Sequence, residues 1–155
     1  MVSLVTGASG LLGHSLANVL AQNNESVRAL IRKASDKNLF DSNNIESVIG
    51  DLTDQVSLKE AVKGVDVVYH CAATSTDWAD WDTYYGGNVD GVRNLLDAVI
   101  AESKAIRFVH VSSTDVYGFP VRVVSEEAPM VDVGLPYNQT KIMGENLVQQ
   151  AYKEH

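Results

Sequence analysis

Three glycines follow the first apolar run of the chain in a pattern that suits phosphate binding. The segment TGASGLLG, Thr6 to Gly13, places them at G-x-x-G-x-x-G spacing between that run and a helical pattern. Such glycines allow a tight turn, a close approach of a pyrophosphate to backbone N–H groups, and close packing of a helix on a sheet. A turn that binds nothing would show the same glycines, but their place at the first strand-to-helix junction favours dinucleotide binding. The expected contacts are Gly7, Ser9, Gly10, Leu11, Leu12 and Gly13.

The end of the second apolar run indicates which dinucleotide this would be. An NAD enzyme usually carries an acid about 20 residues beyond the glycines, where it accepts hydrogen bonds from the adenosine ribose. Here the run ends ALIRK, so Arg32 and Lys33 occupy that place. Two cations suit the 2′-phosphate of NADP. We therefore expect NADP, with NAD as the alternative if both cations are ordinary solvated residues.

An aspartate follows the third apolar run, in the sequence GDLTD. Asp51 is a candidate acceptor for the adenine amino group, with Leu52 beside it. The alternative is that Asp51 caps a helix that begins near Gln55.

The stretch from Ser112 to Lys141 contains a second set of chemical groups. Tyr137 and Lys141 are four residues apart, which places a phenol and an ammonium on one helical face. A neighbouring ammonium favours the phenolate form, so the pair is suited to proton transfer. The alternative is that Tyr137 packs at a helix start and that Lys141 is a surface residue.

Short apolar runs that alternate with helical patterns must position these groups. Strands are expected at Val2–Thr6, Ser26–Ile31, Ile45–Ile49, Val65–Cys71 and Ile106–Val111. Helices are expected at Leu11–Gln22, Ser57–Val62, Val89–Glu102 and Pro136–Tyr152, with a short helical turn at Asp36–Phe40. This order predicts an α/β chain, a single domain over residues 1–155 with a doubly wound Rossmann fold and a parallel sheet of about five strands.

Together these motifs resemble the extended branch of the short-chain dehydrogenase/reductase family, which includes NAD-dependent epimerases and dehydratases and dihydroflavonol-reductase-like enzymes. The resembling segments are TGASGLLG, GDLTD, HCAA from His70, NVDGVRNLLDA from Asn88, VSSTDVYG from Val111, and YNQTK from Tyr137. The resemblance covers nearly the whole chain, and its specificity lies in the order and spacing of the motifs.

The resemblance implies a role for individual residues. Tyr137 and Lys141 match the family's Tyr-x-x-x-Lys pair, which also contacts the cofactor, and Ser113 matches the serine that orients the substrate. Asn88 would support a water relay toward the lysine. Ala72 and Ala73 would let the cofactor approach. Ser113 also has a structural alternative, since its hydroxyl can satisfy local backbone groups at a strand end.

The resemblance also sets expectations for the substrate and the assembly. The substrate would be a small molecule, a sugar nucleotide or a carbonyl or alcohol compound. Extended members are about twice this length, so we expect the C-terminal substrate region to be lacking. A homodimer would form through the helices that follow Val89 and Tyr137. The alternative function is a redox-sensing or regulatory module that binds a dinucleotide without turnover.

Composition restricts the other functional classes. The net charge of −8 repels phosphate backbones and anionic membranes, so neither nucleic acid nor a membrane is an expected partner. One cysteine and four scattered histidines offer neither a disulfide framework nor metal-ligand spacing. The N-terminus shows no signal peptide, and no apolar stretch is long enough to span a membrane. A cytoplasmic location is expected.

The segment from Thr74 to Asn88 is the least regular part of the chain. It holds Trp78, Trp81 and two tyrosines among three aspartates. Exposed aromatic side chains here are candidates for stacking on a ligand. The alternative is that they pack on the following helix or on a partner subunit.

Overall fold

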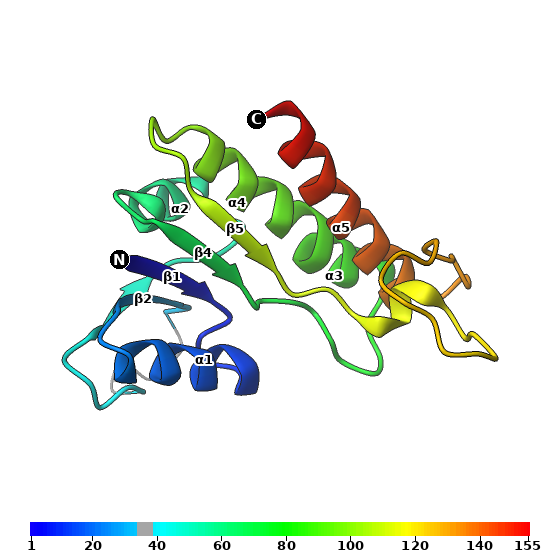
Figure 1. Cartoon of the computed structure of the whole chain (residues 1–155), viewed down its shortest axis with the longest axis horizontal. Helices are drawn as coiled ribbons and strands as arrows, with labels where there is room; N and C mark the ends of the chain where they lie inside the picture. Colours follow the sequence, from blue (N-terminus) through cyan, green and yellow to red (C-terminus); the bar gives the residue numbers. More distant parts are fainter. Residues whose placement is uncertain (34–38) are drawn as a thin grey trace.

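Short runs rich in β-branched residues form the centre of the molecule. A computed structural model describes residues 1–33 and 39–155. The strands within these residues are β1 (Val2–Thr6), β2 (Ser26–Ile31), β3 (Ile45–Ile49), β4 (Val67–His70) and β5 (Arg107–His110). Every neighbouring pair is parallel, and the order across the sheet is β3-β2-β1-β4-β5 (Figure 1). The predicted parallel sheet of a Rossmann fold is confirmed.

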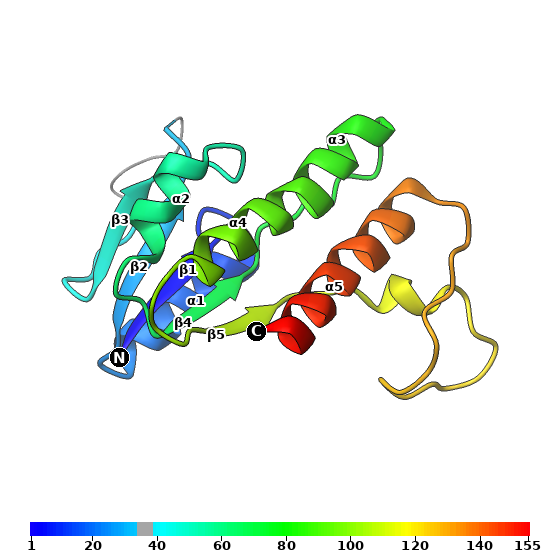
Figure 2. The same cartoon turned by 90° about the horizontal axis from the view of Figure 1, so that it is seen from above.

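Helices cover both faces of this sheet. They are α1 (Leu11–Gln22), α2 (Gln55–Val62), α3 (Trp81–Tyr85), α4 (Gly91–Ile100) and α5 (Pro136–Glu154). The α1 helix lies on one face, whereas α2, α4 and α5 lie on the other (Figures 1 and 2). A π-helical turn, Gly86–Asp90, joins α3 to α4, and a 3-10 turn, Thr114–Tyr117, follows β5. This two-sided cover is the doubly wound arrangement that the sequence predicts.

Consecutive residues of β1 divide the core into two clusters. Leu4 belongs to the cluster that includes Leu58 of α2 and Leu95 of α4. Val5 points to the opposite face and belongs to the cluster that includes Leu20 of α1. All of these side chains are buried. A central strand buried on both faces explains why β1 reads as a continuous apolar run rather than an alternating one.

The boundaries of some elements differ from the sequence-based expectation. The α2 helix begins at Gln55 rather than Ser57, because the Asp54 carboxylate accepts hydrogen bonds from the backbone N–H groups of Val56 and Ser57. The segment judged least regular contains α3, which Asp80 caps in the same way. The helical turn expected at Asp36–Phe40 falls largely outside the described residues.

The strand order places a crevice at one end of the sheet. Because β1 lies between β2 and β4, the chain changes direction across the sheet at this point, and ligands of such folds bind beyond the carboxyl ends of these strands. The β1 turn, Arg32, Asp51 and the segment after β4 all lie at this end. Among the described residues, no helix combines the length and apolar character needed to cross a bilayer.

Candidate functional site

The turn from β1 into α1 leaves no room for side chains at two of its glycines. Gly7 has φ +65°, and a Cβ atom there would lie 2.7 Å from the backbone nitrogen of Ala72. A Cβ atom on Gly13 would lie 2.3 Å from the carbonyl oxygen of Gly7. The N–H of Gly10 donates to the same carbonyl oxygen at 2.9 Å and closes the turn. These contacts explain the glycine spacing, because the turn, the α1 helix and the segment after β4 approach one another at backbone distance.

The first turn of α1 retains its donors for a ligand. Gly10 occupies the N-cap position, and no side chain of the described residues caps the helix there. Backbone N–H groups at a helix start otherwise lack partners and carry partial positive charge. The arrangement of a glycine cradle and an uncapped helix start therefore fits a pyrophosphate.

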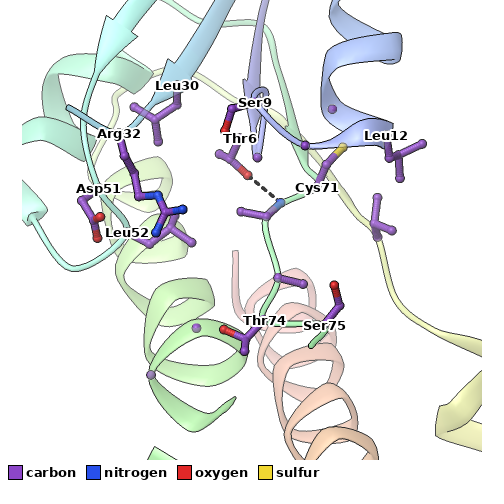
Figure 3. Close-up of a pocket in the computed structure, with 18 of the residues that line it drawn as sticks. Thr6, Ser9, Leu12, Leu30, Arg32, Asp51, Leu52, Cys71, Thr74 and Ser75 are labelled. Carbon is purple, nitrogen blue, oxygen red and sulfur yellow. Dashed lines mark hydrogen bonds between the residues drawn. The ribbon is translucent and has the colours of Figure 1, made fainter. Parts of the chain in front are cut away.

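A cavity of about 610 Å³ opens in front of this turn. Its size is in the range of cofactor sites. Figure 3 shows Arg32, Asp51 and Leu52 on one side, and Thr74 and Ser75 at another part of the wall. The lining residues are Thr6, Gly7, Ser9, Gly10, Leu11, Leu12, Gly13, Leu30, Arg32, Gly50, Asp51, Leu52, Thr53, Cys71, Ala72, Ala73, Thr74, Ser75, Gly86, Gly87, Val111, Ser112, Tyr137 and Lys141.

One end of the cavity is lined by a cation, Arg32, and an anion, Asp51. The Asp51 carboxylate accepts hydrogen bonds from the backbone N–H of Thr53 at 2.9 Å and from its hydroxyl at 2.8 Å. These bonds, and to a smaller extent the charge of Arg32, hold the pKa of Asp51 below its usual value. Asp51 is thus an ionised acceptor at neutral pH. It does not cap α2, a role that Asp54 takes.

A buried histidine supports the floor of the cavity. His70 is fully buried, and its Nδ1 lies 2.7 Å from the hydroxyl oxygen of Thr6. The same hydroxyl oxygen accepts a hydrogen bond from the backbone N–H of Ala72 (Figure 3). Thr6 therefore ties β1 to the residue that faces Gly7. His70 also stacks on His110 of the neighbouring strand, with ring centroids 5.4 Å apart.

Acid is expected to destabilise the fold through these two histidines. Burial, with the charges of His110 and Lys141 as smaller causes, lowers the pKa of His70 to about 3. Burial, followed by the charge of Lys141, lowers the pKa of His110 to about 4. In the unfolded chain these two histidines bind protons near pH 6.5, whereas in the folded chain they stay neutral at that pH. The free energy of unfolding therefore decreases as the pH falls below 6.5. Between pH 7 and pH 5 the expected loss is about 4 kcal/mol, roughly equal parts from the two histidines.

Urea unfolding at several pH values between 7 and 5 measures this dependence. Carboxylates with lowered pKa values contribute mainly at lower pH, so the histidines dominate this window. The His70→Gln variant should lose about half of the slope, whatever its stability at pH 7. An unchanged slope in that variant would show that His70 is not held neutral.

The α5 helix places a phenol and an ammonium on the cavity wall. Tyr137 and Lys141 both line the cavity, and the Tyr137 ring lies 6.0 Å from that of Tyr84. The Lys141 ammonium donates to the carbonyl oxygen of Val111 at 2.7 Å. Burial lowers the pKa of Lys141, whereas the carboxylate of Glu145 opposes this effect. Tyr137 and Lys141 thus lie on the same face of α5, as their four-residue spacing predicts.

Two asparagines hold the loops around this helix. Asn138 is 2% exposed; its side chain donates to the carbonyl oxygens of Asp115 and Val131 and accepts from the N–H of Val133. Asn88 is also buried and bonds both the N–H and the carbonyl oxygen of Thr74, a cavity residue. Each of these amides makes several directed bonds, so each fixes a segment of the wall.

Most of the residues predicted from the sequence meet at this cavity. Those that line it are Gly7, Ser9, Gly10, Leu11, Leu12, Gly13, Arg32, Asp51, Leu52, Ala72, Ala73, Tyr137 and Lys141. They come from five separate segments of the chain, which the carboxyl ends of β1, β2, β3 and β4 and the start of α5 bring together.

Three predicted residues lie elsewhere. Lys33 is exposed and does not line the cavity. Ser113 lines a smaller pocket rather than the cavity. Its hydroxyl accepts a hydrogen bond from the backbone N–H of Asp115, which is the local role that a serine after a strand can take. Asn88 acts through Thr74 rather than on the cavity itself.

The whole arrangement can be compared with known protein families. A family model described as the NAD dependent epimerase/dehydratase family matches residues 3–155. The chain belongs to this epimerase/dehydratase family. It is thereby a member of the extended short-chain dehydrogenase/reductase group, as its motifs predict.

Several known proteins resemble this chain over nearly its whole length. Sterol demethylase protein B of Methylococcus capsulatus is 36% identical over 150 residues, or 94% of this chain and 45% of that protein. A farnesyl-dihydroquinoline-oxide ketoreductase of Stigmatella aurantiaca is 34% identical over 97% of this chain and 46% of its own. A UDP-glucuronic acid 4-epimerase from Bacillus cereus, solved with UDP-glucuronic acid and NAD, superposes with a TM-score of 0.88 at 28% identity, over 99% of this chain and 52% of that one. The chain therefore spans about half the length of these proteins.

Two residues of this site, Ser112 and Asn138, were not predicted from the sequence. Ser112 lines the cavity and donates to the carboxylate of Glu145, so the Lys141–Glu145 pair on α5 holds two consecutive residues at the end of β5. Asn138 follows the predicted Tyr137 directly. The i, i+4 spacing of Lys141 and Glu145 was visible in the sequence, but their partners lie about 30 residues away. No metal-binding group of three or more acidic, histidine or cysteine side chains occurs in the described ranges.

Proposed function

We propose that this chain is the nucleotide-binding part of an NADP-dependent oxidoreductase that acts at a carbonyl or alcohol carbon. The observation that carries this proposal is that the glycine turn and the Tyr137–Lys141 pair line one cavity. The similar ketoreductase and 4-epimerase support chemistry at such a carbon. The glycine cradle, which a Cβ atom would fill, fits the pyrophosphate of a dinucleotide.

Each group of the cavity has a proposed task. The N–H groups at the start of α1 bind the pyrophosphate, Asp51 accepts from the adenine amino group, and the bound dinucleotide supplies or accepts a hydride. Tyr137 donates its phenolic proton to the substrate oxygen during reduction, and the Lys141 ammonium stabilises the resulting phenolate. Ser113 lines the smaller pocket, which shares Ser112 with the cavity, and its proposed task is to orient a substrate oxygen that reaches this pocket. Asn88 holds the cavity wall through Thr74.

NADPH is expected to bind more tightly than NADH. Arg32 lines the cavity where an NAD enzyme carries an acid, and its guanidinium can form charge-assisted bonds to a 2′-phosphate. Titration followed by nicotinamide fluorescence should show about a tenfold preference for NADPH. The Arg32→Ala variant should lose that preference and bind both forms alike.

Lys33→Ala is the matched control for this titration. Lys33 carries the same charge one residue along the chain but does not line the cavity. Its loss should change the preference by much less. Equal affinity for NADPH and NADH in the unmodified chain would contradict the NADP assignment, and no affinity for either would contradict the dinucleotide site itself.

We further propose that two copies associate through α4 and α5. These helices lie side by side on one face of the sheet (Figure 2). Ile100 of α4 is 39% exposed and Met143 of α5 is 40% exposed, so both helices present apolar surface. Sedimentation velocity should show a dimer, and Met143→Glu should shift it toward monomer. A monomer at all concentrations tested would contradict this assembly.

A further inference from the structure

The segment that leaves the cavity after β4 presents two large aromatic side chains. Ser75 lines the cavity, and Trp78 follows three residues later with 92% of its surface exposed. Trp81 begins α3, remains 39% exposed, and contacts Tyr85 in a tilted arrangement with ring centroids 5.8 Å apart. Gly86, the next residue, again lines the cavity. The two tryptophans therefore lie on a segment that starts and ends at the cavity wall; we call their surface the tryptophan wall.

The backbone that carries this wall is firmly anchored. The hydroxyl of Tyr84 donates to the carbonyl oxygen of Thr76 at 2.5 Å, and the Tyr84 ring is buried against Tyr137. The side chain of Asn88 holds Thr74 by two hydrogen bonds. Trp78 thus lies on a backbone segment with fixed ends, so ligand binding has to order its side chain but not the segment.

The charges beside the wall limit the kind of ligand. The segment of residues 74–88 contains three aspartates and no lysine or arginine. Asp77 and Asp80 flank Trp78 closely, and both are exposed. An anionic group such as a pyrophosphate would be repelled here. An uncharged apolar chain or ring gains from covering an indole face and meets no such repulsion.

We infer that the tryptophan wall binds the uncharged apolar part of the substrate, while the carbonyl or alcohol group of the same molecule lies at Tyr137. This inference rests on the proposed function and narrows its substrate class to lipophilic carbonyl or alcohol compounds. Tyr84 connects the wall to the phenol, because it follows Trp81 by three residues on α3 and its ring centroid lies 6.0 Å from that of Tyr137. The helix that carries Trp81 therefore packs directly against the proposed proton donor.

The two tryptophans are also the reporters of the test. They are the only tryptophans in the chain, so its indole emission comes entirely from this wall. With NADPH present, 2-dodecanone should produce a saturable change in that emission, and UDP-glucuronic acid should produce none. Trp78→Ala should weaken ketone binding about tenfold, read from the remaining Trp81. Trp78→Phe, which keeps an aromatic face, should retain most of the affinity.

Val19→Ala is the control. Val19 is 51% exposed on α1, so this substitution removes apolar surface at a place away from the tryptophan wall. Ketone affinity that is equal in Trp78→Ala and the unmodified chain would overturn the inference, as would a comparable response to UDP-glucuronic acid. NADPH binding is followed in the same samples by nicotinamide emission. Retained NADPH binding without a ketone response would sink this inference alone, whereas lost NADPH binding in the unmodified chain would sink the proposed function as well.

Discussion

Replacement of Gly13 by alanine is expected to abolish dinucleotide binding and to destabilise the fold. The new Cβ atom would lie 2.3 Å from the carbonyl oxygen of Gly7 and 2.7 Å from its carbonyl carbon. Both are backbone atoms of a turn closed by the hydrogen bond from Gly10, so no side chain can rotate away to relieve the clash. Either α1 moves off the sheet or the turn changes shape. We expect a loss of about 3 kcal/mol in stability and at least about 100-fold in NADPH affinity.

Urea unfolding and NADPH titration measure the two effects of Gly13→Ala. Gly86→Ala is the stability control, because a Cβ atom there meets nothing within 4 Å and the residue has helical φ and ψ angles. It should be neutral or stabilising by up to about 1 kcal/mol. Ser15→Ala, at an exposed position on the same helix as Gly13, is the binding control. Wild-type affinity in Gly13→Ala would show that the dinucleotide does not bind at this turn.

Replacement of Tyr137 by phenylalanine is expected to reduce turnover about 1000-fold without loss of NADPH binding. The variant removes the proposed proton donor and keeps the ring that packs 6.0 Å from that of Tyr84. The hydrogen bond of Lys141 to Val111 does not involve the phenol and should persist. NADPH oxidation in the presence of 2-dodecanone measures the rate, and nicotinamide fluorescence measures the binding.

Tyr152→Phe is a matched control, since Tyr152 lies on the same helix and is 88% exposed. It should leave the rate unchanged. The Tyr137 variant also separates an enzyme from a redox-sensing module, because a sensor needs dinucleotide occupancy and no proton donor. Full activity in Tyr137→Phe would remove Tyr137 from the proposed mechanism.

Features that depend on near neighbours in the chain could be predicted from the sequence. The glycine spacing at Gly7, Gly10 and Gly13 identified the turn, because a positive φ at Gly7 and contacts at backbone distance at Gly7 and Gly13 leave no room for a Cβ atom. The order of apolar runs predicted the parallel sheet, since runs buried on both faces suit crossover connections. The four-residue spacing of Tyr137 and Lys141 placed them together, because helical geometry repeats at that interval.

The role of individual polar residues depended on partners far along the chain. Of the two aspartates in GDLTD, the sequence offered Asp51 as a helix cap, yet Asp54 caps α2 and leaves Asp51 on the cavity. Adjacent serines at the end of β5 look alike in the sequence, but strand geometry directs Ser112 to the cavity and to Glu145, and Ser113 to a local turn. A shift of one residue decides the face of a strand, which composition cannot show.

The sequence by itself thus determined the fold, the glycine turn and the Tyr137–Lys141 pair, because each rests on a local repeat or on a steric limit of glycine. Only the tertiary structure decided which side chains hold the segments around the cavity in place. Thr6 joins Ala72 across 66 residues, and Asn138 joins α5 to Asp115 across 23. Such bonds form only after the sheet brings separate segments together, and many polar side chains of similar type compete for each place. The packing of the sheet and helices, rather than any pattern along the chain, selects among them.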